Sequence, residues 1–401
     1  MNITTTSATS FTRAARLLLV LAFASALLVS LVAGCGGVGV GGTGTYASGP
    51  ITGFGSVIVN GVRFDDSSAS VLDEDGGSRI RSELKLGMTV DIDSDAIRSD
   101  SSGSNATASR IRFGSEIVGP LQSVDLAGGT LRVLGQTVRV AVETIFDDRI
   151  AGGIAGLSAG QVVEVYALFD AARGSYNATR IEPRAGAAAW RLRGLVSSLD
   201  PLARTLVIGG STFVYATANG VPANLAAGSY VRLRLNTALD GAGRYVVNSF
   251  GVAVRAPEDR DEAKLRGAVT AFTSLANFQV NGLAVDASAA TFPDGAAGVA
   301  LGARLQIEGA TRAGVLVASK VEIETDDELR GRGFELIGNI ESVNPAARTF
   351  VLRGVTVSTA RPDLRLDDGT LADIAAGREV EVRAELAANR TVLEATRIKF
   401  R

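Results

Sequence analysis

Two groups of charged residues alternate with apolar residues at a spacing suited to binding chemistry. Arg191 and Arg193 stand two positions apart, and so do Arg232 and Arg234. Side chains two apart lie on one face of a β-strand, so each pair would project from the same side. Because a guanidinium binds a carboxylate or phosphate through two parallel hydrogen bonds, the four arginines are candidates for binding an acidic partner, such as an anionic glycan or a lipid headgroup.

Asp91, Asp93 and Asp95 alternate in the same way and suggest a second role for the arginines. The arginines could dock onto this acidic stripe, either within the chain or between two chains. A third interpretation is simpler: both groups are solvated strand faces, where exposed ion pairs contribute little stability. The sequence alone favours this third interpretation over the two binding roles.

Composition excludes several kinds of active site. The chain has no histidine and one cysteine, so His-based triads, Cys–His pairs, His/Cys zinc sites and structural disulfides are excluded. The stretch that starts at Asp91 fails the calcium-binding EF-hand pattern, because Ala96 and Ser102 stand where glycine and glutamate are required. A metal site built from oxygen ligands alone stays open, because the chain has 42 acidic residues. We predict a protein that is not an enzyme and that has no metal and no cofactor.

Five copies of one unit would position these residues. Each copy starts with a short glycine-led stretch: GPITGF at Gly49, GPLQSV at Gly119, GLVSSL at Gly194, GAVTAF at Gly267 and GNIESV at Gly338. A hairpin turn follows, clearest in SVIVNGVRFDD with Asn60-Gly61, and then a glycine that precedes a further strand. Landmarks in a fixed order, repeated every 70 to 75 residues, indicate tandem repeats.

Each copy predicts about five short strands with alternation of period two. A five-stranded unit of this size closes most simply into a small barrel, because closure removes exposed edges. We therefore predict an all-β protein with five tandem, small, five-stranded, OB-like barrels. The stretch before the fourth strand of a copy has room for a short helical turn. The predicted barrels are residues 49–116, 117–184, 190–255, 263–326 and 334–401.

The fourth strand of each copy predicts a fixed core face and a variable outer face. The core face carries Ile92, Val165, Leu233, Ile307 and Val382, and the residues on either side of each are expected in solvent. The net charge of a copy is the number of lysine and arginine residues less the number of aspartate and glutamate residues. It is −4 for the first copy and +5 for the third. The third copy is therefore the one most suited to an acidic partner.

Nucleic acid is not an expected partner. The formal net charge is −2 and aromatic residues make up 5% of the chain, whereas single-strand binding needs a basic groove with stacking aromatics. Trp190, next to the first arginine pair, is the one candidate for stacking. We expect it instead to anchor the first strand of its own barrel.

The N-terminus has the pattern of a bacterial lipoprotein leader. Arg13 and Arg16 precede an apolar segment from Leu17 to Val32, which is short for a membrane span. The following VAGC resembles the lipobox of bacterial lipoproteins, and the resemblance implies cleavage after residue 34 and lipid attachment at Cys35. The alternative is an uncleaved N-terminal membrane anchor.

The residues after the cysteine bear on location. Gly36 stands where the enterobacterial sorting rule has aspartate for retention in the inner membrane, so the resemblance implies an outer-membrane lipoprotein facing the periplasm or the cell surface. Acyl chains at Cys35 would exceed the two signals that stable anchoring needs. Residues 35–48 are rich in glycine and predict a flexible tether.

The repeat landmarks resemble a bacterial domain-of-unknown-function family, numbered 5666, which is found in exported proteins and lipoproteins. The resemblance covers residues 49–401 and is best in ITGFGSVIVNGVRFD of the first copy. Because the shared positions are hairpin glycines and apolar strand residues, the family implies a fold and an exported location, and it implies no catalytic residue.

We predict a non-enzymatic lipoprotein of the cell envelope that is held to the membrane by its N-terminal lipid and acts as a binding or scaffold module. Its partner would be an envelope protein or an anionic glycan, and the sequence sets no oligomeric state. One alternative is an anionic polysaccharide-binding or matrix component that uses the arginines of the third copy. A carboxylate-dependent hydrolase is a weaker alternative, because no acidic residue recurs among the copies to select a catalytic pair.

Overall fold

The computed structural model describes residues 42–101, 103–331 and 333–401. The predicted signal peptide and Cys35 lie outside these ranges. Residues 43–401 belong to one unit, and 57% of the chain is in strands against 5% in helices. No helix within the described ranges is long and apolar enough to cross a membrane.

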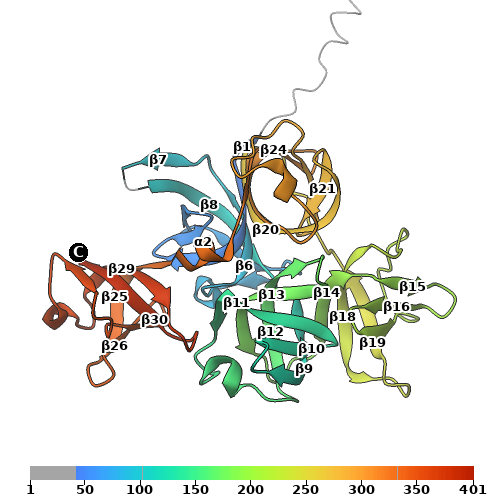
Figure 1. Cartoon of the computed structure of the whole chain (residues 1–401), viewed down its shortest axis with the longest axis horizontal. Helices are drawn as coiled ribbons and strands as arrows, with labels where there is room; N and C mark the ends of the chain where they lie inside the picture. The colour runs from blue at the N-terminus through green and yellow to red at the C-terminus, as the bar shows by residue number, and fades with distance from the viewer. Residues whose placement is uncertain (1–41, 102, 332) are drawn as a thin grey trace, which may run out of the picture. The chain divides into compact units, whose positions relative to one another are not determined.

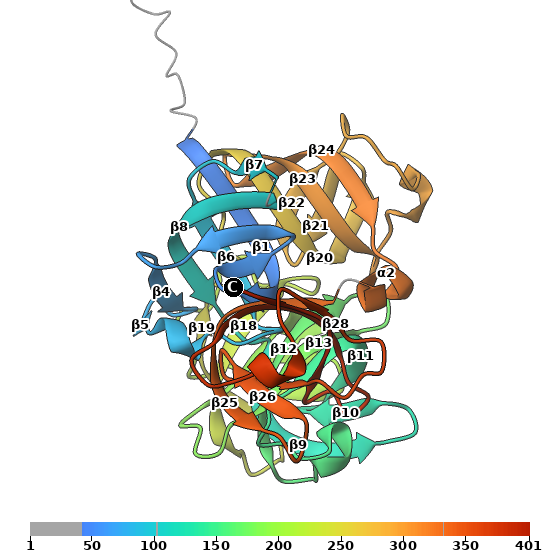
Figure 2. The ribbon, with the colours of Figure 1, turned by 90° about the vertical axis from the view of Figure 1, so that its left-hand side faces the viewer.

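The first barrel is a closed ring of five strands. β1 (Gly42–Phe54) pairs antiparallel with β2 (Val57–Val59), which forms a hairpin with β3 (Val62–Asp65). β3 runs parallel to β8 (Gly103–Phe113), and β6 (Thr89–Ser94) lies antiparallel between β8 and β1, which closes the ring. Figure 2 shows β1, β6 and β8 in blue to cyan, side by side in this barrel.

The same ring of pairings recurs along the described chain. The second ring is β9 (Ile117–Asp125), β10 (Thr130–Val133), β11 (Gln136–Phe146), β13 (Ser175–Pro183) and β12 (Val162–Asp170). The third is β14 (Trp190–Leu195) continued by β15 (Ser198–Asp200), then β16 (Thr205–Ile208), β17 (Ser211–Val214), β19 (Tyr245–Gly251) and β18 (Tyr230–Leu239).

Two further rings complete the described residues. The fourth is β20 (Arg260–Ser274), β21 (Asn277–Val280), β22 (Leu283–Asp286), β24 (Val315–Ile323) and β23 (Arg304–Arg312), and Figure 1 shows its closure plainly. The fifth is β25 (Phe334–Asn344), β26 (Thr349–Leu352), β27 (Val355–Ser358), β30 (Leu393–Phe400) and β29 (Glu379–Leu386). The predicted all-β architecture of small five-stranded barrels is confirmed.

Short helices and strands lie outside the five-stranded rings. A helical turn precedes the fourth strand in four of the five barrels, as η1 (Arg81–Glu83), η2 (Gly153–Gly156), η3 (Ala296–Gly298) and η4 (Leu371–Asp373). The third barrel has none between β17 and β18. The remaining elements are β4 (Ser70–Asp73), β5 (Ser78–Arg79), β7 (Arg98–Asp100), β28 (Arg365–Asp367) and the helix α2 (Asp326–Gly331), which precedes β25.

The hairpin turn between β2 and β3 has the geometry that its sequence predicts. Asn60 has φ 52° and Gly61 has φ 76°, and two successive positive φ values match the twist of the flanking strands. Leu134 (φ 52°) and Arg353 (φ 54°) take the asparagine position in the second and fifth barrels. The turn backbone is therefore kept even where the residue tolerates it less well.

The predicted tether is too long at its C-terminal end. Residues 42–48 form the first half of β1, and Thr45 to Pro50 pair with Ser94 to Thr89 of β6. Tyr46 and Ala47 are buried, at 8% and 0% exposure, so this glycine-rich segment has a core-facing side. Burial of these side chains together with the backbone ladder outweighs the flexibility that its glycines predict.

The core face of the fourth strand is buried in every barrel, as the alternation predicts. The expectation that the flanking residues face solvent is wrong for Glu164, Tyr166 and Arg232, which are 5%, 2% and 7% exposed. Glu164 and Arg232 are covered by ion pairs, and Tyr166 belongs to a core cluster formed mainly by the first and fifth barrels. Packing between barrels, which a single-barrel pattern does not contain, causes the difference.

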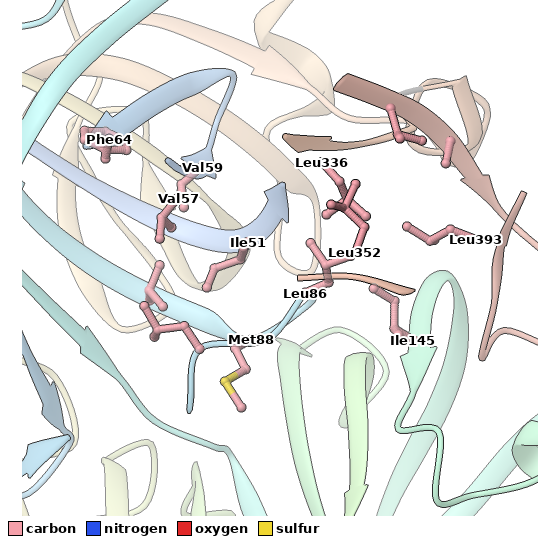
Figure 3. Close-up of a cluster of buried hydrophobic side chains, with 14 of the residues drawn as sticks. Ile51, Val57, Val59, Phe64, Leu86, Met88, Ile145, Leu336, Leu352 and Leu393 are labelled. Carbon is pink, nitrogen blue, oxygen red and sulfur yellow. The ribbon is translucent and has the colours of Figure 1, made fainter. Parts of the chain in front are cut away.

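Apolar cores extend across barrel boundaries. The second and third barrels share one cluster, and Tyr46 of β1 joins the cluster of the fourth barrel. A third cluster unites the first and fifth barrels with Ile145 of β11. Figure 3 shows Leu86 and Met88 of the first barrel in this cluster with Leu352 of the fifth.

Candidate functional site

One buried carboxylate gathers three of the four arginines that the sequence singles out. Glu74 lies in the turn between β4 and β5 and is 5% exposed. Its Oε1 accepts a hydrogen bond from Arg191 Nη1 at 2.8 Å, and its Oε2 accepts one from Arg193 Nη2 at 3.0 Å. Arg232 Nε lies 3.1 Å from the same Oε2. We call this set, with the acids described next, the Glu74 network.

Each arginine of the Glu74 network also holds a second carboxylate. Arg193 Nη1 donates to Glu116 Oε1 at 2.8 Å, and Arg191 Nη2 donates to Glu164 Oε1 at 3.2 Å. Arg232 Nη2 is paired with Asp75. The arginines come from the third barrel, Glu74 and Asp75 from the first, Glu164 from the second, and Glu116 directly precedes the second.

Strand pairing explains why the arginines meet. β14 pairs with β18 so that Arg191 stands opposite Arg234 and Arg193 opposite Arg232. Leu192 and Leu233, between them, are fully buried, so all four arginines lie on the outer face, as period two predicts. Arg234, unlike the others, is exposed.

Burial sets the protonation behaviour of this network. Burial raises the pKa of Glu116. The Arg193 charge and a hydrogen bond from the Tyr230 hydroxyl to Glu116 Oε2, at 3.1 Å, lower this pKa but do not cancel the effect of burial. Burial lowers the pKa of Arg193, but attraction to Glu116 and Glu74 outweighs it, so the net pKa lies above the usual range. Burial and the nearby Glu116 charge raise the pKa of Tyr230 well above its usual value.

The acidic stripe is not brought to the arginines of the third barrel. Asp91 accepts a hydrogen bond from the Tyr46 hydroxyl at 3.0 Å, and burial together with the Asp91 charge raises the pKa of that tyrosine. Asp93 pairs with Arg110 at 2.8 Å and lies 3.7 Å from Arg260 of the fourth barrel. Asp95 accepts a backbone hydrogen bond from Thr107 at 2.6 Å. The acidic stripe therefore serves its own barrel and the fourth.

Glu74, Asp75 and Glu116 are the residues that sequence reasoning missed. Glu74 and Asp75 lie in LDEDGG, a stretch with ordinary loop composition, and Arg191 follows Glu74 by 117 residues. No local spacing marks such a contact. The net charges of the first and third copies, which have opposite signs, are the one signal that pointed to an interaction between them.

A cavity of about 100 Å³ lies beside the Glu74 network. It is lined by Glu74, Glu116 and Arg193 and by a further cation, Arg112 on β8. Burial, and then repulsion from Arg255 and Arg110, lowers the pKa of Arg112. The space equals that of about three waters at 30 Å³ each, so it suits solvent or a very small ion.

The arrangement pairs cations with anions and is suited to holding barrels together. Within the described ranges, no group of three or more histidine, cysteine, aspartate or glutamate residues is placed to hold a metal ion. Trp190 packs edge-on against Tyr245 of its own barrel, with ring centres 5.9 Å apart, which agrees with the anchoring role expected for it.

Comparisons with known proteins find a family model that matches three segments of the chain. The solved structure described as "drosophila Unr CSD456" is 15% identical, and the match covers 42% of this chain and 77% of that one with a TM-score of 0.15. No curated protein sequence matches the chain. The profile of the family described as Domain of unknown function (DUF5666) matches residues 118–182, 266–322 and 337–399, which fall within the second, fourth and fifth barrels. Three segments of the chain therefore match the model of the DUF5666 family.

Proposed function

We propose that this protein is a non-enzymatic scaffold of the cell envelope that presents its barrels to partners in one fixed arrangement. The observation that carries the proposal is the Glu74 carboxylate of the first barrel, which holds three arginines of the third. A chain whose barrels bound ligands independently would have no need of a buried charge network between them.

Buried ion pairs favour a single docking geometry. Any other arrangement of the first and third barrels would separate Glu74 from Arg232, which are both buried and pair across the two barrels, and an unpaired buried charge costs several kcal/mol. The shared apolar clusters supply the non-directional part of the attraction, and the ion pairs make the orientation specific. Apolar contacts together with orienting ion pairs support a scaffold more than a set of separate binding modules.

The proposal includes anchoring through a lipid on Cys35, which lies outside the described residues. Because Cys35 is the one cysteine of the chain, Cys35→Ser is a clean test. We expect the variant to be released from membranes or to fail in maturation, measured by fractionation and by metabolic labelling with a fatty acid. Normally acylated, membrane-bound protein from Cys35→Ser would end this part of the proposal.

The scaffold role is tested by partner capture from envelope extract with the full chain. We compare wild type with Glu74→Gln, which loosens the barrels, and with Arg234→Glu, which changes the exposed arginine. A scaffold predicts that capture falls in Glu74→Gln and is unchanged in Arg234→Glu. Equal capture by wild type and Glu74→Gln would show that single barrels bind partners by themselves, and loss in Arg234→Glu alone would favour an acidic ligand on the third barrel.

A further inference from the structure

A groove of about 410 Å³ lies where the third barrel meets the fourth. Its volume falls in the range of about 300–1,000 Å³ that is typical of small-molecule sites. Among the described residues that line the groove, none is charged and none belongs to the Glu74 network. The lining residues used below are Asn224, Phe250 and Gly251 of the third barrel and Gln279 of the fourth.

Phe250 departs from the pattern of the other barrels. It pairs with Leu233, the core-facing residue of the fourth strand. The residues in the same register of the other barrels are Ile111, Ile181, Val321 and Ile398. Those four side chains are at most 1% exposed, whereas Phe250 is partly exposed and lines the groove. The third barrel therefore presents an aromatic ring at a position that only fills the core elsewhere.

Gly251 removes a charge that the other barrels carry. It pairs with Arg232 of β18. The residues in the same register of the other barrels are Arg112, Glu182, Glu322 and Lys399. A β-carbon at Gly251 would lie 2.8 Å from Arg232 Nη1, so the buried arginine fills the space that a side chain would need. The glycine therefore keeps this wall of the groove uncharged.

Two side-chain amides border the groove from opposite barrels. The third barrel lacks the helical turn that precedes the fourth strand in the other barrels, and Asn224 lies exposed in this connection. Gln279 lies on β21 of the fourth barrel and is partly exposed. Neither amide has a hydrogen-bond partner within the described ranges, and neither is among the buried polar atoms. Both amides are therefore free to donate to a ligand and to accept from it.

The groove offers little to a charged ligand or to a peptide strand. A charged ligand would find no counter-ion among the described lining residues. A peptide strand needs a free sheet edge. At Phe250, however, β19 is paired with β18 on one side, and Phe250 N donates to Asn219 O at 2.9 Å on the other.

A neutral sugar fits the groups that are present. Its hydroxyls both donate and accept hydrogen bonds, as the amides of Asn224 and Gln279 do. The C–H groups on one face of a sugar ring suit the partial negative charge on the face of an aromatic ring such as that of Phe250. Tyr215 packs edge-to-face with Phe250, with ring centres 6.1 Å apart, which holds the Phe250 ring in place.

We propose that this groove binds a short, neutral segment of a glycan. One sugar ring lies on Phe250, and its hydroxyls pair with the amides of Asn224 and Gln279. The site goes beyond the scaffold role and does not depend on it, because no described lining residue belongs to the Glu74 network.

The test is binding of the neutral disaccharides cellobiose, maltose and lactose to the full chain, measured by ligand-observed NMR and titration calorimetry. We expect saturable binding of at least one of them. Its affinity should fall about fivefold in each of Asn224→Ala, Gln279→Ala and Phe250→Ile. Matched controls outside the groove are Asn339→Ala, an exposed amide on β25, and Phe272→Ile, a 38% exposed ring on β20, and both should bind as wild type does.

Folding is checked separately by the melting temperature without ligand. Phe250→Ile introduces the kind of residue that the other barrels carry in this register, so it should melt close to wild type. If it melts lower, the two amide variants keep the test valid, because neither amide makes a hydrogen bond within the described part of the chain.

Two results would overturn the inference directly. One is the absence of saturable binding for all the disaccharides, and the other is undiminished affinity in both amide variants. Tighter binding of glucuronate or of tetra-alanine than of the disaccharides would also overturn it, in favour of an anionic ligand or a peptide.

Discussion

The Glu74 network makes a strong prediction for Glu74→Gln, which keeps the size of the side chain and removes its charge. In wild type, Glu74 is 5% exposed and three arginine nitrogens lie 2.8, 3.0 and 3.1 Å from its carboxylate oxygens. A glutamine amide oxygen in the place of Oε2 can accept from Arg193 and Arg232, and the amide nitrogen then faces Arg191. The substitution therefore places a donor against donors in a buried site.

The magnitude follows from burial and from the remaining partners. Removing one member of a buried ion pair costs about 3–5 kcal/mol. Arg191, Arg193 and Arg232 each keep a second carboxylate, so we expect the lower end, about 3 kcal/mol. A matched control is Glu258→Gln, because Glu258 also pairs with two arginines but its side chain is 61% exposed, and exposed pairs contribute about 1 kcal/mol or less.

The assay is urea unfolding of the full chain followed by fluorescence of Trp190. This residue is the one tryptophan of the chain and directly precedes Arg191, so its signal reports the third barrel beside the Glu74 network. With a denaturant dependence of about 1–3 kcal/mol per molar, the midpoint for Glu74→Gln should fall by about 1 M or more.

The comparison with the exposed control decides the matter. If Glu74→Gln shifts the midpoint no more than Glu258→Gln does, the Glu74 network contributes nothing that surface pairs do not. The docking of the first barrel against the third would then rest on apolar contacts alone, and the rigid scaffold would lose its main support.

Three further predictions concern the same unit. Because burial raises the pKa of Glu116, the stability that this residue contributes is lost as pH rises from 4.5 through its folded pKa. The unfolding free energy of wild type should therefore fall relative to that of Glu116→Gln over this pH range, and parallel pH profiles of the two proteins would contradict the raised pKa. Gly87→Ala would place a methyl group against the backbone oxygen of Thr179, whereas the new methyl group of Gly377→Ala meets open space. Gly87→Ala should therefore lower the free energy of unfolding in urea by about 1–3 kcal/mol more than Gly377→Ala does, and equal losses would refute the close approach. Arg234→Glu should change the unfolding free energy by less than about 0.5 kcal/mol, because the side chain is exposed, and a larger loss would reveal a contact that the structure does not contain.

Much of the fold could be predicted because its signals are local. The Asn60-Gly61 turn, the period-two alternation and the recurring glycine before the fourth strand each depend on a few neighbouring residues. At that recurring position, Gly87 has φ 80° and Gly377 has φ 86°, a backbone that favours glycine. Repetition of these local rules was enough to predict closed five-stranded barrels.

The sequence predicted the arginines of the site but not the carboxylate that they bind. Period two placed Arg191, Arg193 and Arg232 on one outer face, but their acceptor Glu74 lies in a loop with no distinguishing pattern. Contacts between barrels depend on how two finished surfaces fit, which no spacing along one strand encodes. The same reason explains why Glu164 was expected in solvent and is buried.

The pairing of β1 has a mechanical consequence. β1 holds six residue pairs with β6 at its start, and at its far end Gly53 and Phe54 pair with Glu335 and Leu336 of β25 in the fifth barrel. Tension applied at the start of β1, as a membrane tether would apply it, therefore reaches the first and last barrels together. Such a chain would resist stretching as one body until this strand gave way, whereas beads on a string would yield one after another.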